Sequence, residues 1–277
     1  MRSLPTYILL TRIEDYTYCL GYTGNQIPKS NEGARDAFNW EGAFVYEELG
    51  RAIMPPGVQR ARTRLICLEN TFHLDRGLAV EKSRYADTVD IARRHGLPVF
   101  MDGARIFNAA LATNTTVGDL TGFCDAVDVC LCKGLAAPLG SMLMGSRDFI
   151  DEARRIRQRI GGGMRQAGVI AAPGILALTK MVERLPEDHE NAETMRRGLE
   201  AKGIAVDRGG VLTNIVNLDV SPAGWKAPLF AEKLLACGIR AKVCTDRTLR
   251  MVLHNDIGAR EVSVVLDRVG EVLRGRA

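Results

Sequence analysis

Short apolar runs alternate with stretches of helical spacing along the chain from residue 63 onward. The apolar runs predict four strands, over residues 64–68, 97–101, 126–132 and 140–144. The helical stretches predict three helices in the same region, over residues 80–95, 146–159 and 165–184. Three consecutive glycines at 161–163 separate the last two helices, because glycine carries a large entropic cost inside a helix. Strands that alternate with helices in this way favour a parallel sheet flanked by helices.

A second pattern begins after Pro186. Helices are predicted over residues 188–202, 228–237 and 259–273, and strands over 213–219 and 249–254. The first part of the chain shows no sustained period and many turn-forming residues. We therefore expect an α/β protein in three parts: an atypical N-terminal segment (1–57), a large domain (58–185) and a smaller C-terminal α/β domain (186–277).

Composition narrows the class of protein. The 277 residues are 46% hydrophobic and 25% charged, with a net charge of +4 and no basic tail of the kind that binds nucleic acid. No apolar stretch is long enough to span a membrane and the start does not read as a secretory signal, so a cytoplasmic protein is expected. The seven cysteines form no C-x-x-C pair and the four histidines show no ligand spacing, which predicts no metal site and reduced, mostly buried thiols.

Two charged residues follow predicted strands. Asp102-Gly103 closes the strand over 97–101, and Lys133-Gly134 closes the strand over 126–132. Ligands of parallel sheets bind at the carboxyl ends of the strands. A lysine and an acid at that edge suit pyridoxal 5'-phosphate (PLP), whose aldehyde bonds to the amine and whose ring nitrogen pairs with the carboxylate. Taken singly, a solvated lysine and a turn aspartate are simpler interpretations.

Five ordered motifs decide between these interpretations. They read LICLENT at 65–71, MDGARIFNA at 101–109, VCLCKGL at 129–135, APLGS at 137–141 and GGGMRQAG at 161–168. With them, residues 62–177 closely resemble the threonine aldolase and β-eliminating lyase family of fold-type I PLP enzymes. The segments 213–216 and 249–256 fit the same family more loosely.

The resemblance implies roles for individual residues. Lys133 corresponds to the Schiff-base lysine, and Asp102 to the partner of the pyridine nitrogen. Arg105 lies where the family has an arginine near the cofactor ring and the substrate carboxylate. Arg250 matches an arginine that clamps this carboxylate, a task that suits a planar guanidinium. Arg165 matches a cofactor-binding arginine at a subunit boundary, although a simple helix N-terminal residue is the alternative.

The sequence departs from the family in three places: the histidine position after Glu-Asn-Thr, Gln158, where some members have a lysine, and the N-terminal segment. The family reads Glu-Asn-Thr-His, whereas Phe72 stands here at the histidine position and His73 follows one residue later. His73 is therefore a candidate catalytic base, with a solvent-exposed loop histidine as the alternative. Residues 1–57 also contain no recognisable phosphate-binding loop of the kind that the family places at a helix N-terminus.

The implied activity is cleavage of threonine or allo-threonine to glycine and an aldehyde, with PLP as cofactor. A homodimer or homotetramer is expected, since fold-type I enzymes commonly build each site from two subunits. Two alternatives stay open. One is another reaction of the fold, such as β-elimination, and the other is a truncated, catalytically impaired relative that acts as a non-catalytic or interaction subunit.

Overall fold

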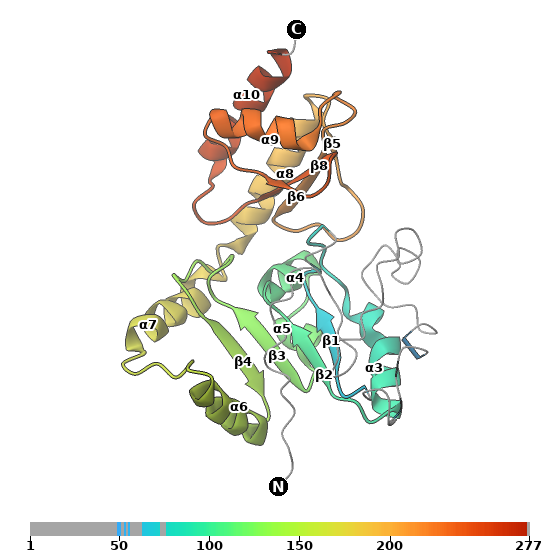
Figure 1. Cartoon of the computed structure of the whole chain (residues 1–277), viewed down its shortest axis with the longest axis vertical. Coiled ribbons are helices and arrows are strands. Elements are labelled where there is room, and N and C mark those ends of the chain that lie inside the picture. The colour runs from blue at the N-terminus through green and yellow to red at the C-terminus, as the bar shows by residue number, and fades with distance from the viewer. Residues whose placement is uncertain (1–48, 51–52, 54, 56–62, 73–75, 276–277) are drawn as a thin grey trace.

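The computed structural model describes residues 49–50, 53, 55, 63–72 and 76–275, which form two four-stranded sheets (Figure 1). The first sheet has the order β1-β2-β3-β4. Its strands are β1 (Ile66–Glu69), β2 (Val99–Asp102), β3 (Ala126–Cys130) and β4 (Ser141–Gly145). β1, β2 and β3 are parallel, and β4 runs antiparallel to β3. The predicted strands are confirmed, and the sheet is mixed rather than wholly parallel.

Alternation along the strands builds the first core. Ile66 and Leu68 of β1 and Val99 and Met101 of β2 are buried, while the residues between them are half-buried. Alternate side chains of a strand point to opposite faces, so one face of the sheet packs into the main apolar cluster. The opposite face carries the polar positions that are described below.

Helices connect β1, β2 and β3, and further helices follow β4. The connecting elements are a 3₁₀ turn (Lys82–Tyr85), α3 (Ala86–Arg94), α4 (Ile106–Ala112) and α5 (Val117–Thr121). The elements after β4 are α6 (Arg147–Arg159), α7 (Gly168–Leu176) and a π-helical turn (Ala177–Met181). Ser146 caps α6, because its hydroxyl accepts a hydrogen bond from the Phe149 N–H. Pro173 lies within α7, and the helical path changes to the π-helical turn shortly after it. α4 and α5 were not predicted.

The second sheet has the order β5-β6-β8-β7, with β5 (Ala205–Val206), β6 (Ile215–Asp219), β7 (Lys242–Val243) and β8 (Thr248–Val252). All its pairs are antiparallel. α8 (Leu185–Glu200), α9 (Ala227–Ala236) and α10 (Ala259–Arg274) pack with it around a second apolar cluster that includes Phe230 and Trp225. The small α/β unit expected from the sequence is therefore present.

α8 leads from the part of the chain that holds the first sheet to the second sheet (Figure 1). Leu185 in its first turn packs with Leu131 and Leu135, beside the first sheet. Met195 and Leu199, further along the helix, belong to the core of the second sheet. One continuous helix therefore contributes to the packing of both parts.

The cysteines are less buried than expected. Of the six that the structure describes, none is fully buried, and Cys132, Cys237 and Cys244 are exposed. The expectation of mostly buried thiols is wrong. Cys132, Cys237 and Cys244 follow the ends of β3, α9 and β7, and Cys67 lies on the half-buried face of β1. Within the described part of the chain, no helix combines the length and the apolar character needed to cross a bilayer.

Candidate active site

Three carboxylates lie side by side across the parallel strands. Glu69 of β1 pairs in register with Asp102 of β2, and Asp102 pairs with Asp128 of β3. Neighbouring residues in register point to the same face of a sheet, so the three side chains form a row near the carboxyl ends of the strands. Burial raises the pKa of the Asp128 carboxyl, and the charge of Asp102 adds to the rise. Only Asp102 in this row was singled out from the sequence.

The turn after β2 holds Asp102 in place. Its Oδ1 accepts a hydrogen bond of 3.0 Å from the Ala104 N–H. The Gly103 N–H donates to the Asp128 carbonyl at 2.8 Å, which ties the turn to β3. A Cβ at position 103 would lie 3.0 Å from that carbonyl oxygen, so the glycine permits the approach.

A second turn presents Lys133 just after β3. The Ala136 N–H donates to the Lys133 carbonyl at 3.0 Å, and the Ala137 N–H donates to the Leu131 carbonyl at 2.9 Å. The Lys133 side chain is exposed, and its charge partly opposes the rise in the pKa of Asp128, which comes chiefly from burial. Lys133 and Asp102 therefore act on the same carboxylate, from the ends of adjacent strands.

Gly134 lets this turn pack closely. A Cβ at position 134 would lie 3.0 Å from Leu185 Cδ2 of α8 and 3.2 Å from Asn108 Oδ1 of α4. The turn that carries Lys133 therefore packs closely against both α8 and α4.

Two arginines, one at the start of α4 and one in β8, lie close enough to influence each other electrostatically. Arg105 is half-buried at the start of α4, and Arg250 of β8 is 9% exposed. Burial lowers the pKa of Arg105, and the Arg250 guanidinium lowers it further. The buried Nε of Arg105 has no hydrogen-bond partner in the described part of the chain. Two neighbouring guanidinium groups in a partly dry setting suit an anion such as a carboxylate.

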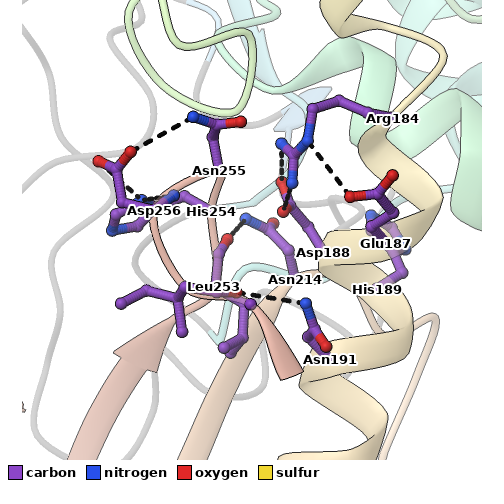
Figure 2. A network of polar contacts seen from close by, with 12 residues as sticks. Arg184, Glu187, Asp188, His189, Asn191, Asn214, Leu253, His254, Asn255 and Asp256 are labelled. Carbon is purple, nitrogen blue, oxygen red and sulfur yellow. Dashed lines mark hydrogen bonds and ion pairs between the residues drawn. The ribbon is translucent and has the colours of Figure 1, made fainter. Parts of the chain in front are cut away.

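A polar network connects the start of α8 with the loop after β8 (Figure 2). Arg184 donates to the fully buried Asp188 at 2.5 Å, and Asn191 donates to the Ile257 carbonyl at 3.2 Å. The first contact stabilises the start of α8, since both of its residues lie there. The second contact holds the loop that leaves β8, the strand that carries Arg250, against α8.

His189 of α8 lies behind the site. Nδ2 of the buried Asn108 is 3.1 Å from His189 Nε2. Burial, and then the charge of Arg196, lower the pKa of His189 to about 4. A neutral imidazole can accept this hydrogen bond, whereas a protonated ring cannot. The contact joins α8 to α4, the helix that begins next to Arg105.

The structure gathers four of the six residues predicted for the site: Lys133, Asp102, Arg105 and Arg250. Arg165 is exposed on the segment between α6 and α7, and its side chain makes no hydrogen bond or ion pair with the residues described. His73 lies outside the described residues. Most of segment 1–57, which contains no recognisable phosphate-binding loop in its sequence, also lies outside the described residues.

Glu69, Asp128, Asn108 and His189 belong to the same region, although the sequence analysis assigned them no role. Glu69 and Asn108 stand inside the quoted motifs, which was the available signal. Asp128 gave a different signal, since it is the acid in an otherwise apolar run.

The residues present fit PLP. A lysine and a carboxylate stand at the ends of adjacent parallel strands, and an arginine with a buried, unsatisfied Nε stands beside them. Lys133 would hold the aldehyde carbon, and Asp102 the ring nitrogen. No group of three or more potential metal ligands occurs among the residues that the structure describes.

Comparison with known proteins gives the same picture. The sequence profile of the beta-eliminating lyase family matches residues 17–221, and this match begins inside the segment set apart as atypical. The chain is 40% identical over 234 residues to low-specificity L-threonine aldolase 1 of Arabidopsis thaliana, covering 82% of this chain and 64% of that protein. It is 36% identical over 225 residues to the low specificity L-threonine aldolase of Escherichia coli O157:H7, covering 81% and 65%. The chain thus spans just under two thirds of the length of these relatives.

Solved structures share the fold. A putative L-allo-threonine aldolase of Listeria monocytogenes EGD-E superimposes with a TM-score of 0.68 at 15% identity, over 88% of this chain and 71% of that one. The structure of SPT with a PLP internal aldimine gives a TM-score of 0.61 at 18% identity, over 83% and 59%. At these identities the likeness establishes the fold, which is that of fold-type I PLP enzymes.

Proposed function

The chain belongs to the beta-eliminating lyase family, and we propose that it is a PLP-dependent lyase of the threonine aldolase type. Its substrate would be a β-hydroxy-α-amino acid such as threonine or allo-threonine, cleaved to glycine and an aldehyde. The observation that carries the proposal is the placement of Lys133 and Asp102 at the ends of adjacent strands, beside the pair Arg105 and Arg250.

Each residue has a distinct task in this reaction. When bound, PLP supplies an electron sink for the bond that breaks between Cα and Cβ. Asp102 keeps a proton on the ring nitrogen, and Lys133 holds the cofactor covalently. Arg105 and Arg250 bind the substrate carboxylate, which orients the amino acid. His73 is the proposed base for the proton of the substrate hydroxyl.

The electrostatics of the site support these tasks. Asp102 stands between Glu69 and Asp128, so its surroundings are rich in negative charge. Such surroundings favour a protonated, cationic ring nitrogen over a neutral one. The charges of Glu69 and Asp102 each raise the pKa of Arg105, so this arginine lies where it offsets part of the charge of the row.

Cofactor attachment tests the proposal directly. The purified chain is mixed with PLP, its visible spectrum is recorded, and the product is reduced with borohydride and digested. We expect imine absorbance and a label on Lys133, with Lys133→Ala unlabelled and Lys82→Ala, a change at an exposed lysine remote from the turn, labelled like the wild type. A label spread over several surface lysines would refute the assignment of Lys133.

The products identify the reaction. With threonine, glycine and acetaldehyde are expected in equal amounts. Release of 2-oxobutyrate and ammonia from threonine would instead point to β-elimination. Binding of PLP with neither pair of products would support a non-catalytic role.

We further propose that the active form is a homodimer or homotetramer in the cytoplasm, with Arg165 reaching the cofactor region of a second subunit. The exposure of Arg165 is compatible with such a contact. Measuring the molar mass by light scattering for wild type and for Arg165→Ala tests this part separately.

A further inference from the structure

Two cysteines lie immediately before Lys133. The Sγ atoms of Cys130 and Cys132 are 3.4 Å apart, on either side of Leu131. We propose that these residues form a dithiol site that a small disulfide compound oxidises to an intramolecular disulfide, and that closure of the bond alters the turn carrying Lys133. The effect on cofactor attachment rests on the proposed function, whereas the oxidation does not.

The backbone at this point permits closure. β3 ends at Cys130, whose pairing with Ser141 is the last pair between β3 and β4. Cys132 lies beyond this ladder in a bend, and both thiols already face each other. A disulfide is about 2.05 Å long, so the sulfur atoms need to approach by about 1.4 Å. The bend can supply this movement without breaking a strand pair.

The exposures of the two thiols set the order of the reaction. Cys132 is exposed and Cys130 is half-buried. Burial, followed by its contact with Cys132, raises the pKa of the Cys130 thiol, so Cys132 reacts first. Its thiolate attacks one sulfur of oxidised glutathione, forms a mixed disulfide and releases one glutathione thiol. The Cys130 thiolate then attacks Cys132 Sγ and releases the second. The protein loses two protons and two electrons, and the glutathione disulfide gains them.

Closure would strain the turn because the new ring contains the whole backbone of Leu131. The carbonyl of Leu131 accepts the Ala137 N–H at 2.9 Å, and the carbonyl of Lys133 accepts the Ala136 N–H at 3.0 Å. Pulling Cys132 toward Cys130 rotates the peptide units that carry these carbonyls. Lys133, which follows Cys132 directly, moves with them.

Peptide mapping tests the dithiol. The full chain is treated with oxidised glutathione, the remaining thiols are alkylated, and the protein is digested with trypsin. Cleavage after Arg105 and Lys133 releases a peptide, 106–133, that holds Cys124, Cys130 and Cys132. We expect Cys124 alkylated and a bond between the other two, reversed by dithiothreitol. A lasting glutathione adduct on Cys132, or a bond that involves Cys124, would overturn the proposal.

Matched variants sharpen this result. Cys132→Ser, which changes one atom, should give no intramolecular bond in the peptide. The exposed Cys237 and Cys244 lie on other peptides and report how strongly the oxidant modifies ordinary surface thiols. A bond between Cys130 and Cys132 at glutathione concentrations that leave these two largely unmodified supports a dedicated site. Equal modification of all four thiols, without the bond, counts against it.

Hydrogen exchange tests the effect on the turn, with no need for cofactor. Loss of one backbone hydrogen bond should make amide exchange over residues 131–139 roughly fivefold faster in the oxidised chain, which corresponds to about 1 kcal/mol. Reduction should restore the original rate, and the oxidant should leave the Cys132→Ser variant unchanged. Formation of the disulfide with unaltered exchange would show that closure leaves the turn intact, which overturns that part of the inference.

Discussion

Acid should weaken the fold through His189. The pKa of this histidine is lowered to about 4 by burial, and further by Arg196, whereas an unfolded histidine titrates near 6.5. The unfolded chain therefore takes up a proton first as the pH falls, so stability is complete above about pH 6.5 and is lost toward pH 4. Between pH 8 and pH 5 this difference lowers the free energy of unfolding by about 2 kcal/mol.

Chemical unfolding at the two pH values measures this loss. Trp225 is buried in the second core and provides a fluorescence signal for urea unfolding. The carboxylates also titrate in this range, so the useful quantity is the difference between wild type and His189→Gln. The variant should lose about 2 kcal/mol less on going from pH 8 to pH 5. His95→Gln, at an exposed histidine, is the control and should behave as the wild type. Equal losses for all three proteins would refute the reasoning.

Three further substitutions test other parts of the structure. Asp102→Asn should weaken PLP binding by tenfold or more in a spectral titration, since an amide does not stabilise a protonated ring nitrogen as a carboxylate does, an effect of about 1.4 kcal/mol. Arg184→Met leaves Asp188 buried without its partner and should cost about 3–5 kcal/mol in urea unfolding, most of it recovered when Asp188→Asn is added. Ala136 has a φ of +57°, so Ala136→Gly should add about 0.5–1 kcal/mol of stability. Ala153→Gly in the middle of α6 should instead remove about 1 kcal/mol, and stabilisation by both glycines would contradict the argument from backbone geometry.

The edge of the first sheet could be predicted because its signals are local. Asp102 and Lys133 each follow an apolar run and precede a glycine, and this pattern can be recognised from a few residues. Asp128 could not be recognised as a site residue because it lies within the apolar run 126–132, and a single acid there does not change the prediction of a strand. Its place in the row of carboxylates follows from its register with Asp102, which depends on how β2 and β3 pair.

Other features depended on long-range packing in the same way. α4 was missed because Ile106–Ala112 is short and nearly all apolar, so it lacks a helical period. The antiparallel order of the second sheet follows from the pairing of β6 with β8, some thirty residues apart. The electrostatic effect of Arg250 on Arg105 requires both sheets to be in place. The motifs suggest roles for these arginines, whereas their proximity depends on the fold.

The course of α8 has a consequence for cooperativity. The predicted domain boundary at 185/186 falls within its first turn, where Leu185 packs beside the first sheet and Arg184 neutralises the buried Asp188. A fragment that starts at residue 186 would lack both contacts and would leave Asp188 without its ion-pair partner. Unfolding of either sheet would therefore remove packing contacts that α8 makes with the other sheet. Calorimetry should record the unfolding of both sheets as a single transition.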